Sequence, residues 1–294
     1  MTPVFNGIPK EKIWFFDNVH HVNGYANQIT ADFIYQVVQE LLLRPDQEQG
    51  QGGRFYIADG YRPKDNLSYL DSKDLQKYIA DMRTACGEEV LRGGRTGCIV
   101  MNCNPFTLGH RYLIEIAAKQ VDTLLIFVVK EDKSAFKFQD RFNMVCEGTK
   151  DISNVHVLPS GDFMISMKTF PGYFSKAKLQ DQNDQTIDST QDVLLFARMI
   201  APALNISIRF AGEEPFDKVT ALYNKNMKRI LPRYGIQFVE IPRKRTADAS
   251  GQIISASSVR TLLENKDYQA LQNYVPDSTL KFLMKKYWTK NILP

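Results

Sequence analysis

The sequence predicts an α/β fold in which helices cover both faces of one parallel sheet, a doubly wound arrangement. Short, continuously apolar runs alternate with helical segments along most of the chain, as expected for strands that are buried on both faces. With 294 residues, 44% apolar content and 24% charged content, the chain can bury one large core and a small appendage, which we expect at the N-terminus.

The predicted elements follow one another in strand and helix pairs. The predicted strands span residues 97–103, 123–129, 154–158, 206–211 and 236–241. The predicted helices span residues 110–119, 139–148, 192–200, 218–231 and 259–264. One or two amphipathic helices within residues 67–83 are expected to dock on the main domain. Repeated units of this kind build a doubly wound sheet, because parallel crossover connections share one hand.

The first candidate site follows the first predicted strand. The stretch Asn104-Pro-Phe-Thr-Leu-Gly-His110 leads into helix 110–119, so His110 lies in the first helical turn. That turn lies near the strand's carboxyl end, where open α/β sheets bind their ligands. Gly109 leaves room for a close approach. Taken alone, the pattern fits a histidine that only caps a helix equally well.

The second candidate site is Ile254-Ser-Ala-Ser-Ser-Val-Arg260. Ser255 and Ser257 are candidates for capping helix 259–264, and Arg260 is expected in its first turn. A basic residue is unfavourable at a helix N-terminus unless an anion is bound there. Because helix N-termini bind phosphate through free N–H groups, the two sites together predict a grip on one polyphosphate.

These two motifs resemble the T/H-x-G-H and I-S-S-T-x-x-R signatures of the nucleotidylyltransferase superfamily, whose fold is Rossmann-like. Within it, residues from about 97 to 287 resemble the C-terminal domain of the citrate lyase ligase family. Four blocks carry this resemblance in the same order, residues 99–114, 129–132, 210–216 and 254–260. Thr107 stands where the superfamily often has its first histidine, and Ala256 where the second signature often has serine.

The resemblance implies an enzyme that uses ATP to adenylate acetate, releases pyrophosphate and then acetylates the prosthetic-group thiol of the citrate lyase acyl carrier subunit. It implies that His110 and Thr107 donate to phosphates and that Arg260 holds the leaving pyrophosphate. Mg²⁺ would bridge phosphate oxygens, with no protein residue expected as a metal ligand. Two alternatives remain: a nucleotidylyltransferase that joins AMP or CMP to a phosphorylated small molecule, and a non-catalytic nucleotide-binding module.

Loops after the predicted strands supply further candidates. Lys130, in the second block of the resemblance, is a fourth catalytic candidate. Lys133 and Arg141 beside it fit either a position near the ligand edge of the sheet or, more often for such residues, a solvated surface. Glu214 fits either a pocket wall or a turn in which Pro215 starts the next helix. The nucleotide-binding candidates are Asn104, Phe106, Gly109, Gly212, Glu214, Ser255 and Ser257. The basic residues 243–245 fit phosphate contacts, an acidic partner or a solvated loop.

The N-terminal part has a different character. Residues 1–46 contain Asp17 and His20 and resemble the C-terminal block of SGNH hydrolases, in which an Asp-x-x-His pair assists a serine. No Gly-Asp-Ser block accompanies this pair, so we expect a remnant or the downstream end of a longer bifunctional protein. The predicted divisions are this fragment, a linker and helical connector over residues 47–94, and the main domain over residues 95–294.

Composition limits the other possibilities. The net charge of +4 is too small to predict nucleic-acid binding. No apolar run has membrane-spanning length and no signal-peptide pattern is present, so the cytoplasm is the expected location. The four cysteines, Cys86, Cys98, Cys103 and Cys146, lack C-x-x-C spacing, which argues against zinc and a disulfide framework. Cys98 and Cys103 are expected on opposite faces of the sheet, with Cys103 either packed or lining the pocket.

Overall fold

The chain divides into two compact units, Met1–Ser68 and Tyr69–Pro294. The computed structural model describes residues 72–87, 94–178, 189–246 and 251–288, all within the second unit. The hydrolase-like fragment expected for residues 1–46 and the linker expected for residues 47–53 lie outside the described residues.

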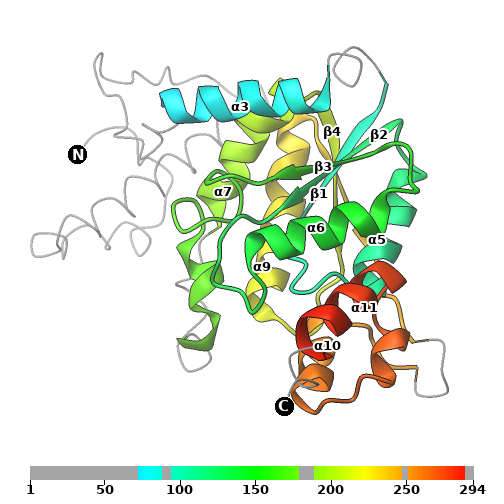
Figure 1. Cartoon of the computed structure of the whole chain (residues 1–294). Helices are drawn as coiled ribbons and strands as arrows, with labels where there is room; N and C mark the ends of the chain where they lie inside the picture. Colours follow the sequence, from blue (N-terminus) through cyan, green and yellow to red (C-terminus); the bar gives the residue numbers. More distant parts are fainter. Residues whose placement is uncertain (1–71, 88–93, 179–188, 247–250, 289–294) are drawn as a thin grey trace, which may run out of the picture. The chain divides into compact units, whose positions relative to one another are not determined.

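The centre of the second unit is a five-stranded parallel sheet with the order β3-β2-β1-β4-β5 (Figure 1). The strands are β1 Thr96–Met101, β2 Thr123–Val128, β3 Val155–Pro159, β4 Ile206–Gly212 and β5 Gln237–Ile241. The chain runs outward from β1 to β3, then crosses back to build β4 and β5 on the other side of β1. The predicted doubly wound α/β fold is therefore confirmed, and its strand order reverses between β1 and β4.

Helices cover both faces of the sheet (Figure 1). One face carries α5 Leu108–Ala118, α6 Phe138–Thr149, α10 Ala256–Glu264 and α11 Asp277–Leu283. The other face carries α3 Lys73–Cys86, α7 Thr190–Leu195 and α9 Lys218–Ile230. Side chains alternate along β1, so that Cys98 packs with the second group and Ile99 with the first. Cys103 lies with Ile99, which confirms that the two cysteines are on opposite sides.

Shorter helical turns complete the unit. They are η5 Pro171–Lys178, η7 Phe196–Ile200, α8 Ala201–Ala203, η8 Leu231–Tyr234, η9 Ala270–Asn273 and η10 Met284–Trp288. The helix predicted over residues 192–200 is α7 continued by the π-helical stretch η7. The helices after residue 264 were not predicted, because no strand follows them to give the regular alternation.

Helix α3 confirms the predicted docking of a helical connector on the main domain. Ser72 caps its first turn by accepting a hydrogen bond from the Leu75 backbone N–H at 3.2 Å. Its apolar side packs into the same core cluster as β1 and β2, and the Tyr78 hydroxyl donates to the Pro159 carbonyl at 2.9 Å. This contact places α3 against the end of β3.

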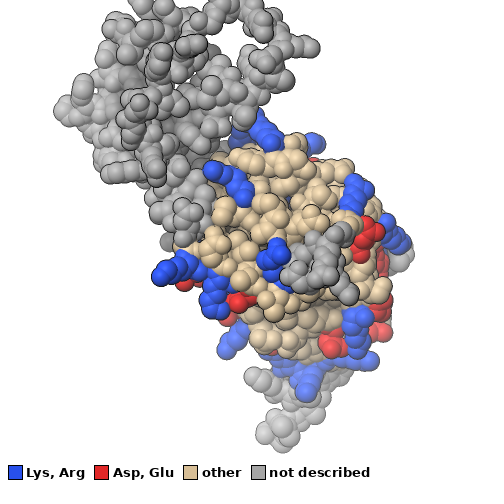
Figure 2. Space-filling model, turned by 90° about the horizontal axis from the view of Figure 1, so that it is seen from above, with Lys and Arg blue, Asp and Glu red and all other residues tan. Residues whose placement is uncertain are grey.

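On the face shown in Figure 2, Lys and Arg side chains of the described residues are spread among acidic and uncharged ones. In the described residues, no helix combines the length and apolar character needed to span a bilayer.

Candidate active site

A cavity of about 930 Å³ lies where the strand order reverses. Its walls come from the ends of β1, β4 and β5 and from the first turns of α5, α9 and α10. The carboxyl ends of parallel strands meet at this edge, and the N-termini of the helices that follow point toward it. The site is therefore at the position where this fold class binds ligands.

The two sequence motifs meet in this cavity. A side chain at Gly109 would place its Cβ 3.0 Å from the Ile254 carbonyl oxygen, so the two backbones approach closely only because Gly109 has none. The Arg260 guanidinium donates from Nη1 to the Asn104 carbonyl at 2.6 Å, across 156 residues of sequence. The N-termini of α5 and α10 thus face one space, as the motifs predicted.

Most of the predicted site residues border this cavity. The lining includes His110, Thr107, Arg260, Asn104, Gly109, Gly212, Glu214, Ser255 and Ser257. Phe106 and Lys130 are predicted site residues that do not line it. Their roles in binding or catalysis remain predictions, but the geometry brings nine of the predicted residues together.

His110 is held by the start of its own helix. Thr107 is the N-cap of α5, and its backbone N–H donates to His110 Nδ1 at 3.0 Å. The Thr107 hydroxyl lies 2.9 Å from the same nitrogen and accepts from the His110 backbone N–H at 3.3 Å. Because Nδ1 is an acceptor, the neutral ring carries its proton on Nε2. The Thr107 hydroxyl oxygen thus caps the first turn of α5, and its predicted donation to a phosphate stays a prediction.

The environment of His110 favours its neutral form. Desolvation, followed by the positive charge of Arg243, lowers the pKa of His110 from 6.5 to about 4. The imidazole is then uncharged at neutral pH and offers one Nε2–H donor. An anion bound at the helix N-terminus would raise this pKa, because it would favour the imidazolium.

We expect the pKa of His110 in the free protein to rise toward 6.5 in the Arg243→Gln variant, because the substitution removes a repelling charge. Desolvation, the larger cause, remains, so the rise is partial. The measurement is an NMR titration of the imidazole resonance that disappears in His110→Ala. The pKa of His110 is about 6.5 in the unfolded chain and about 4 in the folded chain. The unfolded chain therefore binds the proton first, and the free energy of unfolding falls as the pH drops from about 6.5 to about 4. A wild-type midpoint at 6.5 would contradict this environment.

The second motif differs from its prediction in one respect. Helix α10 starts at Ala256, so Arg260 lies in the second turn and not in the first. Ser255 is the N-cap and accepts from the Ser258 backbone N–H at 3.0 Å, as predicted. Ser257 is a helical residue and not a cap, and its hydroxyl accepts from Arg260 Nη2 at 3.3 Å. The helix begins before the predicted residue 259, because the Ser255 side chain accepts a hydrogen bond from a free backbone N–H of the first turn.

Phe106 and Lys130 occupy other positions. The Phe106 ring is fully buried against α6, where a Cβ at Gly148 would lie 2.4 Å from it. The ring also stacks on His110, with centroids 5.9 Å apart, and so supports the imidazole from the core side. The Lys130 side chain is 56% exposed and its Nζ lies 3.7 Å from an Asp162 carboxylate oxygen. In this structure Lys130 is paired at the surface.

Glu214 joins the loop after β4 to the loop after β5. Its carboxylate accepts from the Phe216 and Asp217 backbone N–H groups, both at 3.1 Å, and forms an ion pair with Arg243. Helix α9 starts at Lys218 with Asp217 as its cap, so the alternative in which Pro215 begins the helix is wrong. Of the basic residues 243–245, at least Arg243 is thus a paired wall residue rather than a solvated charge.

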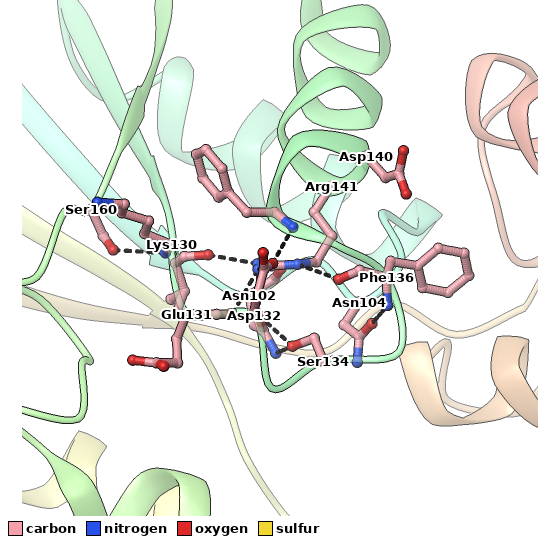
Figure 3. Close-up of polar contacts among 12 residues, drawn as sticks. Asn102, Asn104, Lys130, Glu131, Asp132, Ser134, Phe136, Asp140, Arg141 and Ser160 are labelled. Carbon is pink, nitrogen blue, oxygen red and sulfur yellow. Dashed lines mark hydrogen bonds and ion pairs between the residues drawn. The ribbon is translucent and has the colours of Figure 1, made fainter.

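Arg141 is the clearest correction to the sequence analysis, which favoured a solvated surface position over one near the ligand. It is fully buried, and its guanidinium donates to the backbone carbonyls of Phe136 (2.9 Å), Asn102 (2.9 Å), Val129 (2.6 Å) and Glu131 (2.9 Å). Figure 3 shows these contacts converging from the segments that follow β1 and β2. Arg141 therefore fixes the loops that leave the two strands beside the site.

The sequence analysis also missed Arg209 as a residue of the site. It lies within β4, is 2% exposed and lines the cavity. A charged residue in a strand that is otherwise apolar was the available signal, because arginine is almost never buried without a partner.

No group of three or more His, Cys, Asp or Glu side chains suited to a metal ion occurs among the described residues.

The sequence of the sheet and its flanking helices matches a known family model. Residues 96–283 match the model described as the citrate lyase ligase C-terminal domain. The chain belongs to this family. The resemblance seen in the four sequence blocks is therefore confirmed, whereas the likeness of residues 1–46 to hydrolases remains a prediction.

Relatives named [Citrate [pro-3S]-lyase] ligase share much of this region. The protein from Klebsiella pneumoniae is 44% identical over 199 residues, which cover 66% of this chain and 56% of the relative. The protein from Haemophilus influenzae is 46% identical over 201 residues, with 66% and 57% covered. The Escherichia coli protein is 44% identical over 196 residues, with 65% and 54% covered. The chain thus spans little more than half the length of these relatives.

The solved structures that match this chain in backbone arrangement have low sequence identity to it. Thermotoga maritima TmcAL bound with alpha-thio ATP is 14% identical with a TM-score of 0.41, covering 65% of this chain and 55% of that one. A putative nicotinate-nucleotide adenylyltransferase from Vibrio parahaemolyticus is 16% identical with a TM-score of 0.40, covering 66% and 93%.

Proposed function

We propose that this chain is an ATP-dependent, adenylyl-transferring ligase. It binds ATP in the cavity, transfers AMP to acetate with release of pyrophosphate, and passes the acetyl group to the prosthetic-group thiol of the citrate lyase acyl carrier subunit. The observation that carries the proposal is that His110 and Arg260, from two distant motifs, line one cavity in a member of the citrate lyase ligase C-terminal domain family. ATP is supplied in the cytoplasm, so the proposed reaction belongs there.

In the first step, a carboxylate oxygen of acetate attacks the α-phosphorus of ATP. The bond from that phosphorus to the oxygen bridging the β-phosphorus breaks, leaving acetyl adenylate and pyrophosphate. Such a reaction depends chiefly on alignment and on stabilising the charge that grows on the phosphate oxygens. His110 Nε2–H, the Arg260 guanidinium and the N-termini of α5 and α10 supply that stabilisation. Mg²⁺ held by the phosphate oxygens of ATP would neutralise part of their charge.

In the second step, the thiol sulfur attacks the acetyl carbonyl carbon. The bond from this carbon to the AMP oxygen breaks, a thioester forms, AMP leaves and the thiol proton is released to solvent. The cavity must therefore admit the thiol of the prosthetic group after pyrophosphate has left. Its volume of about 930 Å³ lies at the upper end of the range for ligand sites.

The deciding experiment follows pyrophosphate release by the full chain with Mg²⁺, ATP and acetate. We expect release that requires acetate and ATP, with acetyl adenylate trapped as the hydroxamate when hydroxylamine is present. CTP should not replace ATP. Release with a phosphorylated small molecule but not with acetate would instead identify a nucleotidylyltransferase, and ATP binding without turnover would identify a binding module.

A further inference from the structure

Arg209 is a buried cation whose hydrogen bonding is incomplete. Its Nε has no hydrogen-bond partner among the described residues. Its Nη1 has the Cys98 sulfur, a weak acceptor, at 3.8 Å, and the guanidinium lies 4.6 Å from the centre of the Phe196 ring. A guanidinium stays charged in proteins, and burying a charge without an acceptor is unfavourable. The arrangement is therefore that of a group that awaits an anionic partner.

Asp192 is the acidic neighbour, but its carboxylate is already engaged. One oxygen accepts from the Ile165 backbone N–H and from the Thr169 hydroxyl, both at 2.6 Å. The other accepts from the Tyr223 hydroxyl at 2.7 Å. Asp192 acts on Arg209 through its electrostatic field, which lowers the cost of the buried cation without filling its donors.

Apolar and aromatic residues make up much of the cavity lining on the side of the sheet that carries Arg209. They include Ile165, Tyr173, Phe174, Tyr223 and Met227, together with the polar Thr220 and Asn224 of α9. These residues come from the sheet face opposite α5 and α10, whose N-termini form the phosphate side of the same cavity. A cation at the back of an apolar recess matches a carboxylate that carries a short hydrocarbon group.

We propose that Arg209 binds the carboxylate of the acceptor and that the recess beside it limits this acceptor to a short, unsubstituted monocarboxylate. The inference rests on the proposed function and names the acceptor part of the same cavity. The planar guanidinium holds the carboxylate in one orientation, while the apolar walls contact the methyl group. A lone pair of one carboxylate oxygen remains directed toward the α-phosphorus. A second carboxylate or an amino group on the acceptor would lose its hydration in the recess without gaining a partner.

The test compares Arg209→Lys with Arg209→Met and with the matched control Arg229→Met on the exposed end of α9. Arg209→Lys keeps the positive charge beside Asp192 and thus preserves the fold, but it loses the planar fork. We expect KM for acetate to rise about 10-fold to 100-fold in both Arg209 variants, with KM for ATP within about twofold of wild type. Arg229→Met should match wild type in both constants. Wild type should accept propionate better than malonate or glycine.

A binding measurement separates this inference from the proposed function. Acetate, titrated by calorimetry in the presence of a non-hydrolysable ATP analogue, should bind the wild type and bind Arg209→Lys at least 10-fold more weakly. If wild type binds acetate through Arg209 but never releases pyrophosphate, the proposed function fails and the carboxylate site stands. If both Arg209 variants keep wild-type acetate affinity and KM, or if KM for ATP rises instead, the carboxylate site is wrong.

Discussion

Replacing His110 by alanine is expected to lower kcat for acetate-dependent pyrophosphate release by about 10²–10³-fold. The loss follows from the geometry of the α5 N-terminus, where the Thr107 backbone N–H and hydroxyl both face His110 Nδ1 and leave Nε2–H as the free donor. This donor is fixed before the substrate arrives, so it stabilises the charge growing on the phosphate oxygens without reorganisation. The measurement is kcat at saturating ATP and acetate, with circular dichroism to establish that the variant is folded.

The matched control is His156→Ala, which changes a histidine in β3 that does not line the cavity. Its kcat should stay within about twofold of wild type. A second variant, Thr107→Val, keeps the backbone N–H bond to Nδ1 but removes the hydroxyl, so a smaller loss is expected than for His110→Ala. A folded His110→Ala protein with wild-type kcat would remove His110 from the mechanism.

The sequence predicted the parts of this site that depend on local order. The apolar run before residue 104 and the amphipathic run after it place His110 at a strand-to-helix junction, and α5 begins at Leu108. The capping potential of Ser255 likewise marked the start of α10 to within a few residues. Both signals are short-range, because a helix N-terminus is determined by the residues that satisfy its first free N–H groups.

The unpredicted parts depend on contacts between distant segments. Arg141 looked like one more basic residue beside a charged loop. Its burial follows from carbonyls up to 39 residues away, those of Asn102 just after β1 and Val129 just after β2. The burial of Arg209 depends on a recess that residues of α7 and α9 help to form. Lys130 shows the converse, because its match to a sequence block did not reveal that its side chain turns toward Asp162. No periodic pattern encodes the direction of a side chain in a loop.

These contacts also explain how the two halves of the cavity are joined. The segment after β1 carries Asn104, whose carbonyl accepts from Arg260 and whose side-chain oxygen accepts from the Phe136 backbone N–H at 3.0 Å. Phe136 in turn accepts from Arg141 through its carbonyl. A continuous set of hydrogen bonds thus runs from Arg260 of α10 through Asn104 to the loop after β2. Figure 3 shows its part from Asn104 through Phe136 to Arg141.

The Arg141→Met variant is expected to lose about 2–6 kcal/mol of unfolding free energy, since at least two buried carbonyl groups lose their donor at about 1–3 kcal/mol each. Methionine approximates the length of the side chain, so the loss reports the hydrogen bonds more than a cavity. Urea denaturation followed by circular dichroism measures it, and Arg229→Met on the surface of α9 should stay within about 0.5 kcal/mol of wild type.

The Arg141→Lys variant distinguishes the guanidinium geometry from the charge alone. An ammonium has three donors on one atom, whereas Arg141 uses Nε, Nη1 and Nη2 to reach carbonyls in the loop after β2 and the Asn102 carbonyl after β1. The lysine variant should therefore lie between wild type and Arg141→Met in stability. Its KM for ATP should also rise, because the segments that carry Asn102 and Phe136 lose their common anchor. Asn104, which is hydrogen-bonded to both Phe136 and Arg260, then loses its fixed position in the cavity. Equal stability of Arg141→Met and wild type would show that water replaces these hydrogen bonds and that Arg141 does not hold the site.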